Sequence, residues 1–431
     1  MKIFMLGWEF PPFISGGLGT ACYGLTKAMS QLGLEVTFVL PRICDEQYSG
    51  HVKVLGPGSL SSKPGFDFES LPSVKVHKID SPLQAYDTGG IYKSRLEHIL
   101  KLKRLVSDPD GCELDPAVGE LNYGSDMYSE VYRYASMAAR LAEDEQFDVI
   151  HAHDWMTFPA GIAVAEATHK PLIVHVHSTE FDRSGEHVNQ MVYDIERAGM
   201  QRADRVITVS NFTRNITLSR YGIDSHKVDV VYNGVNRSPV DSRHLSEGEV
   251  KKDEKIVLFL GRITMQKGPE YFIQAAKRVL EVTENVKFVV AGSGDLMHSA
   301  VRRAAELGIG GKVLFTGFLR GQAVEQIYRM ADLYVMPSVS EPFGIVPLEA
   351  LGNDVPAIIS RQSGVSEVLS HVLKVDFWDV EEMANKIVAV LSYPALKNTL
   401  RDYGNSEVRR LHWNRAAEGC IRVYEKLLTA V

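Results

Sequence analysis

Two glutamates, Glu341 and Glu349, stand eight positions apart in the stretch SVSEPFGIVPLEALGNDVPAI, residues 338–358. Pro342 disfavours helical backbone at the residue before it, so Glu341 is expected in a loop. A helix is expected to begin near Gly344, which puts Glu349 about one turn inside it. The first N–H groups of such a helix can bind an anion, and a carboxylate can accept hydrogen bonds from vicinal hydroxyls. The stretch therefore predicts a site for a phosphate group and a ribose, with Glu341 left to contact what the phosphate carries.

Two cations five positions apart, Arg262 and Lys267, lie in FLGRITMQKGPE, residues 259–270. They follow an apolar run that reads as a buried strand, and Gly268-Pro269 opens a helix. The planar guanidinium group suits phosphate oxygens, and lysine adds a point charge. The pair is predicted to hold a diphosphate and to stabilise it as it leaves. The alternative is a pair of solvated surface cations.

Two histidines alternate in DVIHAHDWMT, residues 148–157, at the end of an apolar run. In a strand, His151 and His153 point to the same side. His153 is the better candidate for a ligand contact. The alternative, stronger for His151, is a histidine that only satisfies a backbone carbonyl. A metal site is not expected, because no matched carboxylate or cysteine cluster lies nearby in the sequence.

A glycine-rich segment, FISGGLGTA at residues 13–21, follows the first apolar run. Gly16 and Gly17 would let the backbone approach a ligand closely, and the next helix offers N–H groups to an anion. The spacing does not match the dinucleotide fingerprint, which argues against an NAD oxidoreductase. A plain strand-to-helix turn remains the alternative.

The elements that would position these residues alternate between strand and helix patterns. Short apolar runs rich in Val and Ile are typical of parallel strands buried on both faces. They occur at 2–8, 35–41, 147–154, 171–178, 205–210 and 228–234, and a second series starts at 255. Both halves are predicted to be doubly wound α/β domains, which bind ligands at the carboxyl ends of their strands.

The domain boundaries follow from where this alternation stops. Residues 1–238 are predicted as an N-terminal Rossmann-like domain, with an insertion at about 84–130. Residues 236–255 are polar and read as a linker. Residues 239–411 are predicted as a second Rossmann-like domain, and 412–431 as a final helix that packs back on the N-terminal domain. The role of the insertion is open between a lid or acceptor wall and a structural excursion.

The bulk composition excludes several classes of protein. The chain has 431 residues, 45% hydrophobic and 23% charged, which is typical of a globular protein with two domains. A net charge of −7 argues against nucleic acid or an anionic membrane as the main partner. The four scattered cysteines suggest no zinc site or disulfide framework. Without an apolar run of membrane-spanning length, we expect a cytoplasmic protein.

The motifs together resemble those of retaining glycosyltransferases of family four, which have the GT-B fold of two facing Rossmann-like domains with a cleft between them. The stretches SGGLG, HAHDW, GRITMQKGPEYFIQAAKRV and SEPFGIVPLEALGNDVPAI occur in the order expected for that family and for its relatives, the bacterial and archaeal glycogen and starch synthases. The resemblance runs from Lys2 to about Asn405. It implies that residues 1–238 form the acceptor-side domain and residues 239–411 the nucleotide-sugar donor domain.

The resemblance implies a role for each matched residue. The four residues implied in catalysis are His153 against the donor sugar, Arg262 and Lys267 on the diphosphate, and Glu341 on the sugar hydroxyls. Those implied in donor binding are Gly16, Gly17, Phe343, Gly344, Ile345 and, on the ribose, Glu349. His177, Thr179 and Glu180 in HVHSTEFDRSG are weaker candidates on the sugar or acceptor side. No metal and no cofactor are expected.

The implied activity is transfer of a hexosyl, preferably glucosyl, group from an ADP- or UDP-sugar to a glycan, preferably an α-glucan. Glycogen synthases usually have a lysine before the paired glycines, where this chain has Ser15. A surface polysaccharide or lipid-linked acceptor is therefore an alternative, although membrane association is not expected. A nucleotide-sugar epimerase and a non-catalytic sugar sensor are further alternatives.

Overall fold

The computed structural model describes residues 1–10, 16–42, 74–81, 83, 89–90, 92–97, 126–235 and 254–429. Most of the predicted insertion at 84–130, nearly all of the predicted linker at 236–255, and Ser15 lie outside these residues. Two parallel sheets with helices around each of them make up the described chain. The predicted pair of doubly wound α/β folds is confirmed.

The first sheet has seven strands in the order β3-β2-β1-β4-β5-β6-β7. The strands are β1 (Lys2–Leu6), β2 (Glu35–Arg42), β3 (Val74–Asp80), β4 (Val149–His153), β5 (Leu172–Val176), β6 (Arg205–Thr208) and β7 (Val228–Val230). Both β2 and β4 pair in parallel with β1. The chain thus winds outward from β1 on one side and from β4 on the other. In such sheets the ends of the two central strands frame a ligand crevice.

Helices with bounds in the described part of the chain accompany these strands. They are α1 (Gly17–Gln31), α3 (Met127–Glu143), α4 (Phe158–Thr168), α5 (Glu180–Ser184), α6 (Gln190–Arg202) and α7 (Asn211–Tyr221). Their ends follow from local chemistry. The Asp126 side chain accepts hydrogen bonds from the backbone N–H groups of Tyr128 and Ser129 at the start of α3. Helix α7 ends at Gly222, which adopts a left-handed conformation.

The second sheet has six strands in the order β10-β9-β8-β11-β12-β13. They are β8 (Lys255–Leu260), β9 (Val286–Ala291), β10 (Val313–Gly317), β11 (Leu333–Met336), β12 (Ala357–Ser360) and β13 (Leu373–Val375). The helices are α8 (Pro269–Leu280), α9 (Met297–Glu306), α10 (Gln322–Met330), α11 (Ile345–Gly352), α12 (Val380–Ser392), α13 (Pro394–Val408) and α14 (Trp413–Leu428).

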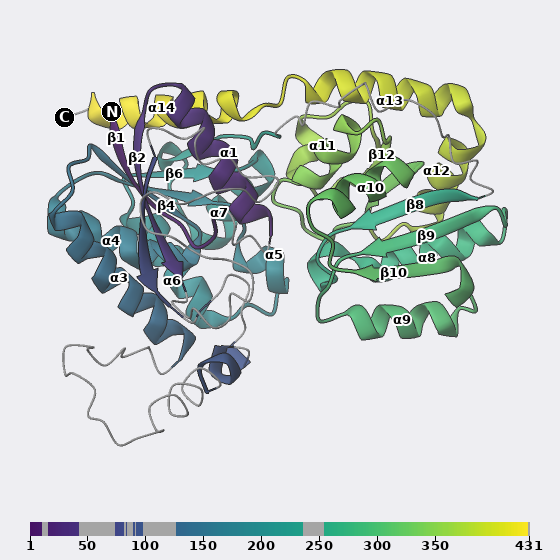
Figure 1. Ribbon diagram of the computed structural model, residues 1–431, viewed down its shortest axis with the longest axis horizontal. Helices are drawn as coiled ribbons and strands as arrows, with labels where there is room; N and C mark the ends of the chain where they lie inside the picture. Colours follow the sequence, from purple (N-terminus) through teal and green to yellow (C-terminus); the bar gives the residue numbers. More distant parts are fainter. Residues whose placement is uncertain are drawn as a thin grey trace, which may run out of the picture. The chain divides into compact units, whose positions relative to one another are not determined.

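Helices cover both faces of this second sheet, as in a doubly wound fold. One apolar core joins the sheet to α8, α9 and α12 through residues such as Phe272, Ala300 and Ile387. The other core joins it to α10 and α11 through Ile327 and Leu348. Figure 1 shows α9 on one side of the sheet and α10 with α11 on the other.

The chain forms two compact units that do not follow the order of the sequence. The N-terminal unit comprises Met1–Val176, Asp194–Ile207 and Cys420–Val431, and the C-terminal unit comprises His177–Tyr193 and Thr208–Gly419. The segment after β5 therefore belongs to the C-terminal unit. Within the N-terminal unit, the hydroxyl group of Tyr424 on α14 lies 2.6 Å from Nδ1 of His151 on β4. None of the described helices combines the length and hydropathy that a membrane span requires.

Gly292, directly after β9, allows the backbone there to approach the end of β8 closely. Its φ is 142°, and a Cβ atom there would lie 1.8 Å from the carbonyl oxygen of Gly261. We therefore expect Gly292→Ala to lower the free energy of unfolding by about 3 kcal/mol or more, through backbone strain and overpacking. The midpoint of urea unfolding measures the effect.

Gly310→Ala is the matched control, because no atom lies within 4 Å of a Cβ at Gly310 and its φ is not positive. Equal urea midpoints for the two variants would contradict the close approach at Gly292.

Candidate active site

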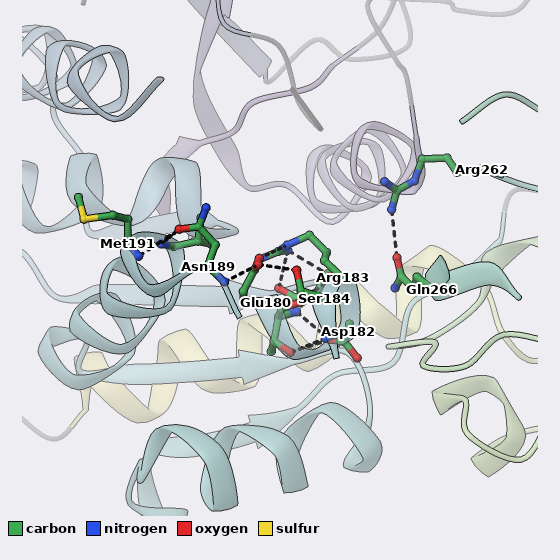
Figure 2. Close-up of polar contacts among 11 residues, drawn as sticks. Glu180, Asp182, Arg183, Ser184, Asn189, Met191, Arg262 and Gln266 are labelled. Atoms are coloured by element: carbon green, nitrogen blue, oxygen red, sulfur yellow. Dashed lines mark hydrogen bonds and ion pairs between the residues drawn. The ribbon is translucent and has the colours of Figure 1, made fainter. Parts of the chain in front are cut away.

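Arg262 lies just beyond β8 of the C-terminal unit, where the sequence predicts a phosphate contact. Its Nη2 donates to Oε1 of Gln266 at 3.2 Å, as Figure 2 shows. Gln266 is buried, and its carbonyl oxygen accepts a hydrogen bond of 2.9 Å from the backbone N–H of Val339. The loop that carries Arg262 is thereby tied to the loop that leads to Glu341. The sequence did not predict that Gln266 would connect these two loops.

Lys267 ends the short 3-10 helix Met265–Lys267, and its ammonium group pairs with the carboxylate of Glu341. The distance between Nζ and Oε2 is 2.5 Å, and the side chains are 21% and 7% exposed. The hydroxyl of Ser338 donates to the same oxygen at 3.0 Å. Glu341 was expected to be available for a sugar. The structure holds it in a largely buried ion pair with the lysine predicted to bind the diphosphate, and its contact with a sugar stays a prediction.

Gly344 is the N-cap of α11, with a φ of 105° that favours glycine. The helix begins at Ile345, and Phe343 before it is buried in the apolar core of the C-terminal unit. The first N–H groups of α11 thus follow the loop that carries Glu341. The predicted helix start is confirmed to within one residue, while the predicted donor contacts of residues 343–345 stay predictions.

Glu349 is the fifth residue of α11, and its side chain is partly buried. The hydroxyl of Tyr328 on α10 donates to Oε2 of Glu349 at 3.0 Å. Burial raises the pKa of Glu349, and the tyrosine hydrogen bond opposes that rise. Tyr328 was missed from sequence, because nothing local shows that α10 lies beside α11.

The hydrogen bond from Tyr328 is expected to set the pH at which Glu349 can act as an acceptor. Nucleotide affinity should fall as the pH decreases through the raised pKa of Glu349, because the protonated carboxyl accepts hydrogen bonds less well. Tyr328→Phe removes the interaction that lowers this pKa, so the fall should begin at a higher pH. At neutral pH we expect affinity to drop about fivefold.

Calorimetric titration with UDP and ADP across the acid range would measure this shift. Tyr403→Phe on α13 is the control, because Tyr403 is 57% exposed. An identical pH profile for the wild type and Tyr328→Phe would rule out the assigned role.

The segment 177–189 of the C-terminal unit carries the weaker candidates. Burial lowers the pKa of His177 to about 3, which keeps its imidazole neutral. Thr179 is the N-cap of α5 and forms a reciprocal capping box with Asp182. Glu180 accepts from Arg183 Nε at 3.0 Å, Ser184 Oγ at 2.6 Å and the backbone N–H of Asn189 at 3.1 Å (Figure 2). These contacts order the segment, and an acceptor role stays a prediction.

Asp182 links α5 to the loop before Glu341 and was not anticipated from sequence. Oδ1 of Asp182 accepts a hydrogen bond of 2.5 Å from the hydroxyl of Ser340. Oδ2 accepts a hydrogen bond of 2.7 Å from the backbone N–H of Thr179. Burial raises the pKa of Asp182, and the bond from Ser340 counters part of that rise. The contact holds Ser340, the neighbour of Glu341, in place.

Gly16 and Gly17 lie where the N-terminal unit begins α1. Gly16 is the N-cap, with no side chain to satisfy the helix N–H groups, and Gly17 is the first helical residue. A carboxylate already lies at this helix end, since Oε2 of Glu9 accepts from the backbone N–H of Gly19 at 3.1 Å. Glu9 therefore already supplies a negative charge at this helix start, and binding of donor phosphates there stays a prediction.

His153 is the last residue of β4, and its side chain is fully buried in the N-terminal unit. It lies next to His151 and to His175 of β5, with ring centroids 4.3 and 5.3 Å away. His153 and His175 are direct partners in the register of the two strands. The alternating pattern VHVHS offered a signal for His175, but the pairing itself is not readable from one sequence.

Comparison with known proteins decides the family. Residues 106–238 match Glycosyltransferase Family 4, and residues 241–407 match Glycosyl transferases group 1. The α-maltose-1-phosphate synthase of Mycolicibacterium smegmatis is 30% identical over 66% of this chain and 80% of its own. The chain belongs to the family-four glycosyltransferases of the GT-B fold.

One further relative and one solved structure match almost the whole of this chain. An uncharacterized glycosyltransferase of Methanocaldococcus jannaschii is 29% identical over 99% of this chain and 98% of its own. The structure of HepE from Anabaena in complex with UDP and glucose has a TM-score of 0.69 at 17% identity, and the match covers 99% of this chain and all of that one. The protein is thus a glycosyltransferase.

Proposed function

We propose that this family-four enzyme transfers a glucosyl group, with retention of anomeric configuration, from an ADP- or UDP-sugar to an α-glucan. The observation that carries the proposal is the ion pair of Lys267 with Glu341 in the C-terminal unit. Buried charges in proteins are retained where they are paired and used. A lysine and a carboxylate held together can contact adjoining parts of one donor, its phosphate and its sugar.

Each side chain of the C-terminal unit then has a task on the donor. Glu349, oriented by Tyr328, accepts hydrogen bonds from the ribose hydroxyls. Arg262 and Lys267 bind the diphosphate, together with the first N–H groups of α11. Glu341 accepts from hydroxyls of the transferred sugar. For His153 we keep the role that the resemblance implies, a contact with the donor sugar.

The reaction proceeds by loosening of the bond between the anomeric carbon and the diphosphate oxygen. The departing oxygen takes the bonding electrons, and Arg262 and Lys267 stabilise its charge. The acceptor hydroxyl attacks the oxocarbenium-like carbon from the same face and passes its proton to the leaving phosphate. Stabilisation of the leaving group lowers the barrier most, and because the two cations supply it, this route needs no metal ion. We therefore expect full turnover in EDTA.

A double displacement with Glu341 as the nucleophile is the competing retaining route. Lys267 and Ser338 both donate to Oε2 of Glu341, which reduces the nucleophilicity of that oxygen. We therefore favour the hydrogen-bonding role. A trapped glycosyl adduct on Glu341, found by mass spectrometry, would reverse this preference.

The preference for glucose and an α-glucan is supported by the SGGLG and HAHDW segments, which resemble those of glucan synthases. One relative is named α-maltose-1-phosphate synthase, and maltose is a disaccharide of glucose. Ser15 in place of the usual lysine leaves the choice between ADP- and UDP-sugars to experiment.

A donor and acceptor screen tests the proposal. The purified chain is incubated with ADP-, UDP- and GDP-sugars, with and without glycogen or maltooligosaccharide, and released nucleotide is measured. We expect release of ADP or UDP that requires the glucan, and an elongated product with an α-linkage. Release together with an altered free sugar, without any acceptor, would identify an epimerase. Transfer only to lipid-linked glycans would refute the glucan assignment.

A further inference from the structure

Three imidazoles gather at the carboxyl ends of β4 and β5 in the N-terminal unit. His151 and His153 share one face of β4, and His175 lies opposite His153 on β5. Their exposed fractions are 0%, 0% and 2%. One ring nitrogen from each lies within 4.8 Å of the others. We call this group the histidine trio. Only His153 has a role in the proposed transfer, so the arrangement of the other two needs its own explanation.

We propose that the histidine trio binds a divalent transition metal of the zinc class. Neutral imidazole is a good ligand for Zn²⁺ and Co²⁺. In a tetrahedral site with metal–nitrogen bonds of about 2.1 Å, ligand nitrogens lie about 3.4 Å apart. Nε2 of His151 and Nδ1 of His175 lie 3.2 Å apart at hydrogen-bond distance, and a bound metal would replace the proton shared between them. Rotation about the broad χ2 torsion of histidine can bring the third nitrogen to that spacing.

Tyr424 supplies the outer contact that metal-bound histidines usually have. Its hydroxyl lies 2.6 Å from Nδ1 of His151 and can donate to Sδ of Met29, 4.0 Å away. A hydroxyl that donates to Met29 can accept the Nδ1–H of His151. That tautomer turns the lone pair of Nε2 toward His175, where the metal would bind.

Three protein ligands leave one coordination position for water, and the site would lie at the end of β4 beside β1, where the first sheet reverses its winding. Because His153 is a ligand, an occupied site withdraws this residue from the donor sugar. Zn²⁺ should therefore inhibit sugar transfer, a consequence that rests on the proposed function. Metal binding should also tighten as the pH rises, since only neutral imidazole binds.

Binding is tested on the full chain, stripped with EDTA, in the absence of any sugar or nucleotide. Co²⁺ alone is titrated, and its visible absorption and its stoichiometry by equilibrium dialysis are recorded. We expect one equivalent with the intense absorption of tetrahedral Co²⁺. His175→Asn should weaken the affinity at least about a hundredfold, and Tyr424→Phe about 10- to 100-fold. His298→Ala, which removes an exposed histidine of α9, should change nothing.

No saturable Co²⁺ binding by the wild type, or the same absorption and affinity in His175→Asn, would overturn the site. If His175→Asn does not fold, Tyr424→Phe provides the test. An unchanged Co²⁺ affinity in Tyr424→Phe would contradict the proposed site, because the site requires the contact between Tyr424 and His151. In a transfer assay, micromolar Zn²⁺ should inhibit the wild type, and EDTA should restore activity. A chain that binds Co²⁺ but transfers no sugar would refute only the proposed function.

Discussion

Replacing Lys267 by methionine is expected to lower the turnover number tenfold to several hundredfold. A charged hydrogen bond to the leaving diphosphate contributes about 1.5–3 kcal/mol, and each 1.36 kcal/mol is about tenfold in rate. The same substitution leaves the carboxylate of Glu341, 7% exposed, without its cation. We therefore also expect the free energy of unfolding to fall by about 1–3 kcal/mol.

A double-mutant cycle separates these two effects. Glu341→Gln in the Lys267→Met background removes the stranded charge, so it should restore most of the stability and none of the turnover. Steady-state kinetics with the donor identified by the screen, together with urea unfolding, measure the four proteins. Recovery of turnover in the double variant would show that Lys267 serves only to neutralise Glu341.

Arg262→Ala is expected to reduce turnover by a similar factor, tenfold to several hundredfold, with little loss of stability. The hydrogen bond to Gln266 spans 3.2 Å, whereas Lys267 pairs with Glu341 at 2.5 Å, so we expect its loss to disturb the loop less than the loss of Lys267 does. Arg262→Lys should lie between the wild type and Arg262→Ala, since it keeps the charge and loses the planar fork.

Arg278→Ala on α8 is the control for removal of a guanidinium group. Its side chain is 50% exposed and pairs with Glu281 and Glu381, so its loss should leave kcat and the unfolding midpoint almost unchanged. Turnover in Arg262→Ala equal to that of the wild type would count heavily against the assignment of Arg262 to the diphosphate.

Local patterns in the sequence predict most of the strands and helices of the fold. The apolar runs of β4 and β5 predicted buried strands, and Pro342 with Gly344 predicted the end of a loop and the start of α11. These predictions rest on backbone restrictions and periodicity, which act over a few residues. The grouping of residues 177–193 with the C-terminal unit depends on long-range packing, and no local pattern marks it.

The candidate site could be predicted less completely, because partners lie far apart in the chain. Glu341 was assigned a sugar contact, but its partner Lys267 is 74 residues away. Tyr328 reaches Glu349 from a different helix. Asp182 meets Ser340 across 158 residues. Single-sequence reasoning identifies residue types that suit a reaction, whereas the groups that orient them depend on which elements become neighbours.

The contact between Tyr424 and His151 joins residues 273 positions apart within one packed unit. A ribosome adds about 5–20 residues per second. Tyr424 is therefore synthesised roughly 15–55 seconds after His151. During that interval the nascent N-terminal sheet lacks a side chain that covers its buried histidines. The N-terminal unit therefore cannot complete its packing until translation has passed α14.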